Sequence, residues 1–258
     1  DCEMSSMCSP EKETVKFLEV IYPKGSVEVW MGGIEEMMRR SVRNVVKIGL
    51  DDYLNEKRGD FVLTHSSQAA IAVTQFYWTQ GIETGLNESG AAGVSAYYDK
   101  MLGQLTELSH LVRTKLTKLQ SKVMSALIVM EVHARDVVEK LMTAKVGSIA
   151  DFEWVSQLRY YWEEKPTALG ETNLLVRMVQ CTFPYGYEYL GASARLVITP
   201  LTDRCYMTCT QSLHYRLGCA PAGPAGTGKT ETVKDLSKAM SVQCKVFCCG
   251  EGLDFKAM

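Results

Sequence analysis

The spacing of apolar residues in the first half of the chain is that of amphipathic helices. From Ser26 to about Ile48, apolar side chains recur every three or four residues with basic residues between them, which predicts a helix with one buried face. Ser66 is a residue type that caps helices, and it opens a second predicted helix that runs towards Leu86. Residues 1–25 lack either periodicity and are predicted to be irregular.

The longest helical pattern lies in the middle of the chain. Apolar residues step by three, four or seven from Leu105 to Met130, and the apolar face continues to Ala144. Both a coiled coil and a packed bundle helix have such a seam, and its short length favours the bundle helix. Residues 57–60 interrupt the earlier pattern and are predicted to be a loop, whereas the aromatic-rich residues 151–162 are predicted to form a short helix.

The pattern changes after Pro166, where short extended segments replace long helices. Further elements are predicted in order: a strand from Asn173, an extended segment at 195–200, helices at 203–217 and from Lys229 to about Met240, and a strand at 244–248. The predicted fold class is therefore α + α/β. A mostly helical region, residues 1–194, precedes the opening part of an α/β nucleotide-binding domain, residues 195–258.

The second region contains a glycine-rich loop with the spacing G-x-x-x-x-G-K-T. Its residues are Gly223, Pro224, Ala225, Gly226, Thr227, Gly228, Lys229 and Thr230. The glycines allow successive backbone N–H groups to point at phosphate oxygens, and the helix predicted to start here directs its N-terminal dipole at the same anion. Lys229 would reach the β- and γ-phosphates, and the Thr230 hydroxyl would bind Mg²⁺. A glycine-rich turn before a surface helix is the alternative interpretation.

Composition excludes several other classes of function. The chain is 46% apolar and 22% charged with a formal net charge of −2, so it gives no electrostatic reason to expect nucleic acid or a membrane surface as a partner. It has no apolar run of the roughly 18 residues that a membrane span requires, and no secretory signal is visible. The absence of an initiating Met suggests a piece of a longer chain.

The other candidates for chemistry have structural interpretations. The nine cysteines lack the paired spacing of a zinc site, and we expect mostly reduced, buried thiols. His133 has acidic and basic sequence neighbours, but adjacent side chains on a helix do not face each other. His133 and His214 are therefore predicted to be structural, and we expect no catalytic residue in this chain.

Several segments resemble the dynein heavy chains. The resemblance is strongest at residues 196–207, 223–231 and 252–258, and it continues upstream at 152–157 and 185–191, with wording closer to axonemal than to cytoplasmic members. It covers nearly the whole chain beyond the first twenty residues. It implies the C-terminal part of the family's linker joined to the start of the first AAA+ module, the main ATPase site of the motor ring.

The resemblance implies a function and its setting. ATP and Mg²⁺ would be the cofactors, and an extended segment would lie against the adenine, through Leu196, Val197, Ile198, Pro200 and Leu201. The parent would be an ATP-driven, minus-end-type microtubule motor of the cytoplasm or cytoskeleton, in a cilium or flagellum axoneme. Its partners would be the remaining ring modules of the heavy chain, and, through the full-length protein, microtubules and dynein intermediate and light chains.

The sequence departs from the family pattern in three places. Cys219 stands where a second glycine is expected before the loop, and Cys248 stands where asparagine is expected after it. The acidic pair that polarises the attacking water in this family is not found after Lys229, so hydrolysis is expected to need residues beyond this chain. A catalytically inert linker or interaction fragment, with weak or no nucleotide binding, is the alternative function.

Overall fold

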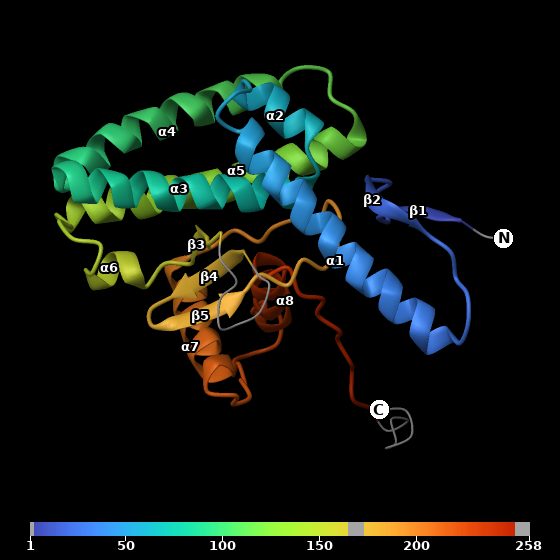
Figure 1. Cartoon of the computed structure of the whole chain (residues 1–258). Helices are drawn as coiled ribbons and strands as arrows, with labels where there is room; N and C mark the ends of the chain where they lie inside the picture. The colour runs from blue at the N-terminus through green and yellow to red at the C-terminus, as the bar shows by residue number, and fades with distance from the viewer. Residues whose placement is uncertain (1–2, 165–172, 251–258) are drawn as a thin grey trace.

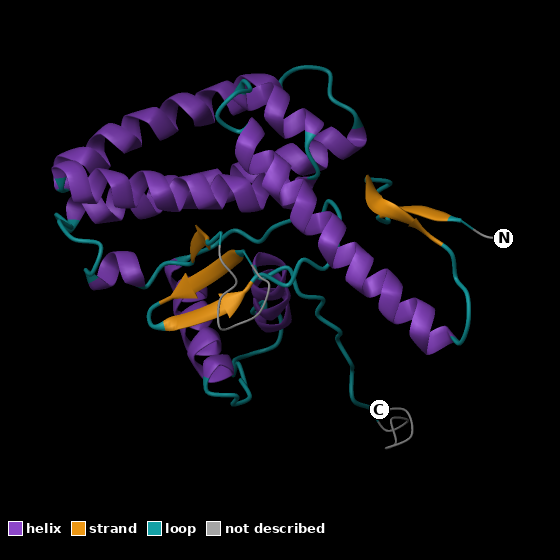
Figure 2. Ribbon diagram, in the orientation of Figure 1, coloured by secondary structure: helices purple, strands orange, loops and turns teal. Residues whose placement is uncertain are grey.

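The computed structural model describes residues 3–164 and 173–250, which form a helical bundle above a small sheet and two further helices (Figure 1). The strands make two separate antiparallel sheets, β1-β2 and β3-β4-β5 (Figure 2). The α + α/β class is confirmed, with most of the chain helical. Among the described residues, none of the helices combines the length and apolarity that crossing a membrane would require.

The N-terminal segment forms a hairpin, so the prediction of an irregular start is wrong for this part. Strand β1 (Met4–Cys8) pairs with β2 (Thr14–Ile21). The hairpin packs beside α1 (Val27–Asp52), where the backbone N–H of Leu18 donates to the Ser41 hydroxyl at 3.1 Å. This packing depends on Ser41, which lies 23 positions from Leu18 in the sequence. The local periodicity of residues 1–25 cannot show such a contact.

Helix α1 confirms the first predicted helix, but the predicted loop at 57–60 is wrong. Residues Arg58–Thr64 form α2, and α3 (Ser67–Ser89) follows as predicted, with Ser66 at its N-cap position. Arg58 is buried at the start of α2 and forms an ion pair with Glu131 on α5. Because Glu131 neutralises its charge, Arg58 can be buried, and the polar character of this residue does not indicate a surface loop.

The predicted seam from Leu105 to Ala144 is divided between two helices. Helix α4 (Ala91–Val112) ends before α5 (Lys118–Thr143), and Thr117 starts α5 with a capping box in which Gln120 is the partner. The reversal lets α4 and α5 pack against each other and against α3, as helices of a bundle. Gly85 and Gly93 permit the contact between α3 and α4, because a Cβ built on Gly93 would lie 2.1 Å from the Gly85 carbonyl oxygen.

A three-stranded sheet follows the bundle. Helix α6 is short (Phe152–Val155), and the rest of the predicted helix at 151–162 is strand β3 (Arg159–Trp162), so that prediction is half wrong. Strand β3 pairs with β4 (Leu174–Met178), the strand predicted from Asn173, and β4 pairs with β5 (Cys181–Pro184). Tyr160 in β3 is buried against α3, where its N–H donates to Thr79 Oγ1 at 3.0 Å.

Two helices complete the described chain. Helices α7 (Pro200–His214) and α8 (Lys229–Ala239) confirm the two predicted near the glycine-rich loop. They share a core cluster with the sheet, made of Met178, Tyr206, Cys209, Leu236 and Met240. The predicted strand at 244–248 is wrong, because these residues are coil without a strand partner in the described chain, and most are exposed. The boundary at 194/195 stays a prediction.

Candidate nucleotide site

The glycine-rich loop ends at the first residue of α8, as the motif requires. Gly226 and Gly228 have φ angles of +77° and +80°, in the left-handed region that favours glycine. Gly228 is the N-cap residue of α8, and Lys229 is the first helical residue. The loop is exposed throughout except for Lys229, which is half-buried. The backbone therefore forms an exposed, bent loop at the N-terminus of a helix.

Lys229 is folded into its own loop. Its ammonium group donates to the carbonyl oxygens of Gly223 at 2.8 Å and Pro224 at 2.5 Å, and lies 3.4 Å from Thr227 Oγ1. The Thr227 hydroxyl donates to the Pro224 carbonyl at 2.9 Å and closes the turn. The positive charge thus occupies the centre of the loop, where the motif would place phosphate oxygens.

The N-terminus of α8 faces the same loop. In the described part of the chain, no side-chain hydrogen bond caps α8, as is also the case for α1, α3 and α4, whereas Thr117 and Thr199 cap α5 and α7. The positive end of the helix dipole is therefore available to an anion. Glu231 in the first turn pairs with Lys234 at 2.7 Å instead, and both side chains are at least one-third exposed.

A buried ion pair fixes the middle of α8. Asp235 accepts two hydrogen bonds from Arg195, at 3.0 and 2.9 Å, one from the Leu196 N–H at 2.9 Å and one from the Tyr206 hydroxyl at 2.7 Å. Burial alone raises the pKa of Asp235, but the Arg195 charge and these hydrogen bonds outweigh it and hold the pKa below its usual value. The pair therefore holds the extended segment at 195–196 against the helix that carries the loop.

The C-terminal end of α8 is attached to the helical region. The Tyr160 hydroxyl donates to the Ala239 carbonyl at 2.8 Å, and the N–H of Gly186 donates to the Met240 carbonyl at 2.9 Å. Gln68 on α3 donates to the Ser241 hydroxyl at 2.6 Å. One end of α8 thus carries the exposed loop, and the other end is tied to α3 and the sheet.

The residues predicted to lie beside adenine begin at Leu196, in the segment that Asp235 holds against α8. Val197 and Leu201 are 67% and 71% exposed, whereas Ile198 is packed into the core clusters. Pro200 is the first residue of α7, and the Leu196 N–H is held by Asp235. The segment is therefore joined to α8 through Asp235, and two of its apolar side chains remain open to solvent.

Sequence reasoning missed the residues that hold the site together. Arg195, Tyr206 and Asp235 are each nearly or fully buried at the side chain, yet the sequence predicted only the loop and the segment beside adenine. One signal in the sequence could have indicated this contact. Asp235 directly precedes Leu236, a residue of the apolar face of α8, and a charge beside a buried helix face needs a partner.

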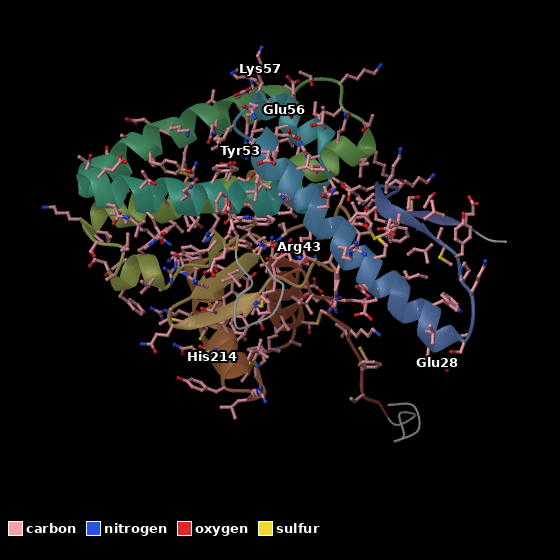
Figure 3. The ribbon with its side chains drawn as sticks, in the orientation of Figure 1. Glu28, Arg43, Tyr53, Glu56, Lys57 and His214 are labelled. Carbon is pink, nitrogen blue, oxygen red and sulfur yellow. The ribbon has the colours of Figure 1, made fainter. Side chains whose placement is uncertain are left out.

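The two histidines considered in the sequence analysis, His133 and His214, lie outside the glycine-rich loop. His133 on α5 is 3.8 Å from Asp203 on α7, and burial lowers the pKa of its imidazole to about 4. His214 ends α7 on the side of the sheet away from the bundle, edge-on to the Phe183 ring at 6.4 Å between centroids (Figure 3). Their predicted structural role stays a prediction.

A glycine-rich loop of this spacing, closed by its lysine at the start of a helix, is the feature that defines P-loop nucleotide-binding proteins. Comparison with known proteins adds a more specific similarity. Residues 185–258 match a family model described as "Hydrolytic ATP binding site of dynein motor region".

The whole chain is similar to one segment of the axonemal dynein heavy chains. It is 48% identical over 258 residues to Dynein axonemal heavy chain 1 of Rattus norvegicus, and 47% identical to the Homo sapiens protein of that name; both alignments cover 100% of this chain and 6% of the relative. It is 47% identical over 259 residues to Dynein axonemal heavy chain 3 of Mus musculus, covering 99% of this chain and 6% of the relative. The resemblance drawn from the sequence is therefore confirmed, and the chain spans about 6% of the length of these relatives.

Proposed function

We propose that the loop at 223–230 binds the phosphates of Mg-ATP, with Lys229 as its principal charge and Thr230 as the protein's Mg²⁺ ligand. The observation that carries the proposal is the local geometry. A loop with two left-handed glycines surrounds the Lys229 ammonium at the uncapped N-terminus of α8. The match to a dynein ATP-binding model supports ATP as the nucleotide. Val197 and Leu201 supply exposed apolar surface for the adenine side of the site, with Leu196, Ile198 and Pro200 in the same segment.

Binding in this chain does not extend to hydrolysis under this proposal. The two carboxylates on α8 are both engaged, Glu231 with Lys234 and Asp235 with Arg195. Neither is free to orient an attacking water, which phosphoryl transfer from ATP requires. We expect the purified chain to show no ATP turnover above background.

The setting of the site follows from the relatives. We infer that the helical region acts as the linker of an ATP-driven microtubule motor of the axoneme, and that α8 connects the nucleotide to it. Hydrogen bonds from Tyr160 and Gln68 to the end of α8 support that connection. The partners would be the other ring modules of the heavy chain and, through the full-length protein, microtubules and the dynein intermediate and light chains.

One observation favours the alternative, a catalytically inert linker or interaction segment with weak or no nucleotide binding. The Lys229 ammonium is already satisfied by carbonyl oxygens of its own loop. A phosphate must replace these hydrogen bonds, so part of its interaction energy with the lysine is offset.

A titration with Mg-ATP separates the two functions. The chain is titrated by calorimetry, and the measurement is repeated on Lys229→Ala and on Lys234→Ala, which removes the same charge from the same helix but outside the loop. We expect Lys229→Ala to weaken binding about tenfold or more, because a hydrogen bond to a charged group contributes roughly 1.5–3 kcal/mol, whereas Lys234→Ala changes the Kd by less than about twofold. No binding in the original chain would establish the alternative, and equal affinity in both variants would contradict the role proposed for Lys229.

A further inference from the structure

Three cysteines surround a surface pocket just before the glycine-rich loop. Cys205 and Cys209 lie one turn apart on α7, and Cys219 faces them from the segment that leads into the loop. The pocket has a volume of about 300 Å³ and is lined by these cysteines together with Arg204, Thr208 and Pro221. Small molecules therefore have access to the pocket, in which the Cys219 thiol is exposed.

Cys219 makes its contact with Cys209 rather than with solvent alone. The Cys219 thiol donates to the Cys209 carbonyl oxygen at 3.6 Å. Cys209 is 8% exposed, whereas Cys219 is exposed. One thiol of the pair is thus open to reagents, and the other is held behind it.

We propose that Cys209 and Cys219 form a reversible disulfide that ties the entry of the phosphate loop to α7. The hydrogen bond from the Cys219 thiol to the Cys209 carbonyl brings the two residues together, and the exposed segment at 217–221 would move to bring their sulfur atoms to bonding distance. The disulfide would restrain residues 210–218, which include the end of α7 and the left-handed turn at Arg216. This inference concerns the thiols and is independent of whether the loop binds ATP.

The oxidant in this proposal is a low-molecular-weight disulfide such as glutathione disulfide. The Cys219 thiolate attacks one glutathione sulfur, the glutathione S–S bond breaks, and one glutathione leaves as thiolate. The Cys209 thiolate then attacks the Cys219 sulfur of the mixed disulfide and displaces the second glutathione. The protons of the two protein thiols end on the two glutathione thiolates, so one disulfide is reduced while another forms.

The order of attack follows from exposure and ionisation. The thiolate is the nucleophile in exchange, and an exposed thiol meets the reagent first. Burial, together with the neighbouring thiols of Cys219 and Cys205, raises the pKa of Cys209 to about 11. Closure by Cys209 is therefore the slow step, and it becomes faster as the pH rises.

Peptide mapping after equilibration in glutathione tests the proposal. The folded chain is held at increasing ratios of oxidised to reduced glutathione, free thiols are blocked with iodoacetamide, and the protein is digested with trypsin. Cleavage after Arg204, Arg216 and Lys229 places Cys209 in peptide 205–216 and Cys219 in peptide 217–229. We expect these two peptides to become covalently joined as the ratio increases, and to separate after reduction.

Single variants identify the partners, because peptide 205–216 also carries Cys205. Cys205→Ser, the matched control on the same helix, keeps the joined peptides, whereas Cys219→Ser and Cys209→Ser lose them. Cys219 is exposed, so its variant is expected to fold even if Cys209→Ser does not. The proposal is overturned if the joined peptides persist in Cys209→Ser, or if Cys219 stops at the glutathione adduct at every ratio.

Discussion

The helical region and the phosphate-loop segment use opposite means to fix their structure. In the bundle, side chains such as Val73 and Leu127 are fully buried, and α3, α4 and α5 hold one another in place. In the segment from α7 to the loop, Tyr215 and Leu217 are 69% and 61% exposed, and the loop is shaped by glycine conformation and by Lys229. The bundle is therefore set by packing, whereas the segment from α7 to the loop is shaped by local hydrogen bonds and remains accessible.

Each region also contains one buried ion pair, and the two pairs differ in how completely they are satisfied. Arg58 donates to Glu131 and Thr74, but its Nε and Nη1 atoms have no hydrogen-bond partner among the described residues. Both carboxylate oxygens of Asp235 accept hydrogen bonds, which come from Arg195, Leu196 and Tyr206. The pair under α8 is thus the better satisfied of the two, and it supports the more exposed region.

The largest effect is expected from breaking the pair under α8. Asp235→Asn keeps the shape of the side chain but leaves the Arg195 charge buried without a counter-ion, which costs roughly 3–5 kcal/mol of unfolding free energy. Glu231→Gln, the control on the same helix, breaks an exposed pair and is expected to leave the stability nearly unchanged. Urea unfolding followed by circular dichroism measures both. Equal losses would show that the Asp235 pair has no special role.

The second expected effect is a pH dependence that comes from the interface of bundle and α7. Burial lowers the pKa of His133 to about 4, so between its ordinary value and pH 4 the unfolded chain binds a proton that the folded chain does not. Stability is therefore lost as the pH falls through this window, by about 3 kcal/mol in total. Burial raises the pKa of the nearby Asp203 carboxyl, which opposes part of this loss.

His133→Gln isolates the histidine's contribution. The variant is unfolded in urea at several values between pH 7 and pH 4, beside the original chain and beside His214→Gln, which changes an exposed histidine on α7. We expect the pH dependence to become shallower in His133→Gln and to stay unchanged in His214→Gln. A steep dependence that survives in His133→Gln would assign it to other groups.

The sequence predicted the elements whose pattern is local and failed where a distant residue decides. The apolar period of α1 and α3, and the spacing of the loop before α8, are properties of consecutive residues, and the structure confirms these elements. Arg58 at the start of α2 depends on Glu131, 73 positions later, and β3 depends on its pairing with β4.

The candidate site shows the same division. The spacing of the loop residues indicates a nucleotide, and the folded loop places the Lys229 ammonium at its centre. The contact between Arg195 and Asp235 joins residues 40 positions apart, and that between Cys219 and Cys209 joins the loop entry to α7. Neither contact has a sequence motif, because each is produced by the packing of α7 and α8 around the sheet.

The smallest expected effect on stability comes from threonine substitutions at the N-termini of α5 and α8. The Thr117 hydroxyl accepts from the Gln120 N–H at 3.2 Å and Gln120 Oε1 accepts from the Thr117 N–H at 3.0 Å, so Thr117→Ala removes a cap and lowers stability by about 1 kcal/mol. Thr230 lies exposed in the first turn of α8, and Thr230→Ala should change stability by less than about 0.5 kcal/mol while weakening Mg²⁺-dependent ATP binding. Unfolding in urea and titration with ATP, with and without Mg²⁺, measure the two effects. If Thr230→Ala costs as much stability as Thr117→Ala, the hydroxyl serves the helix rather than a ligand.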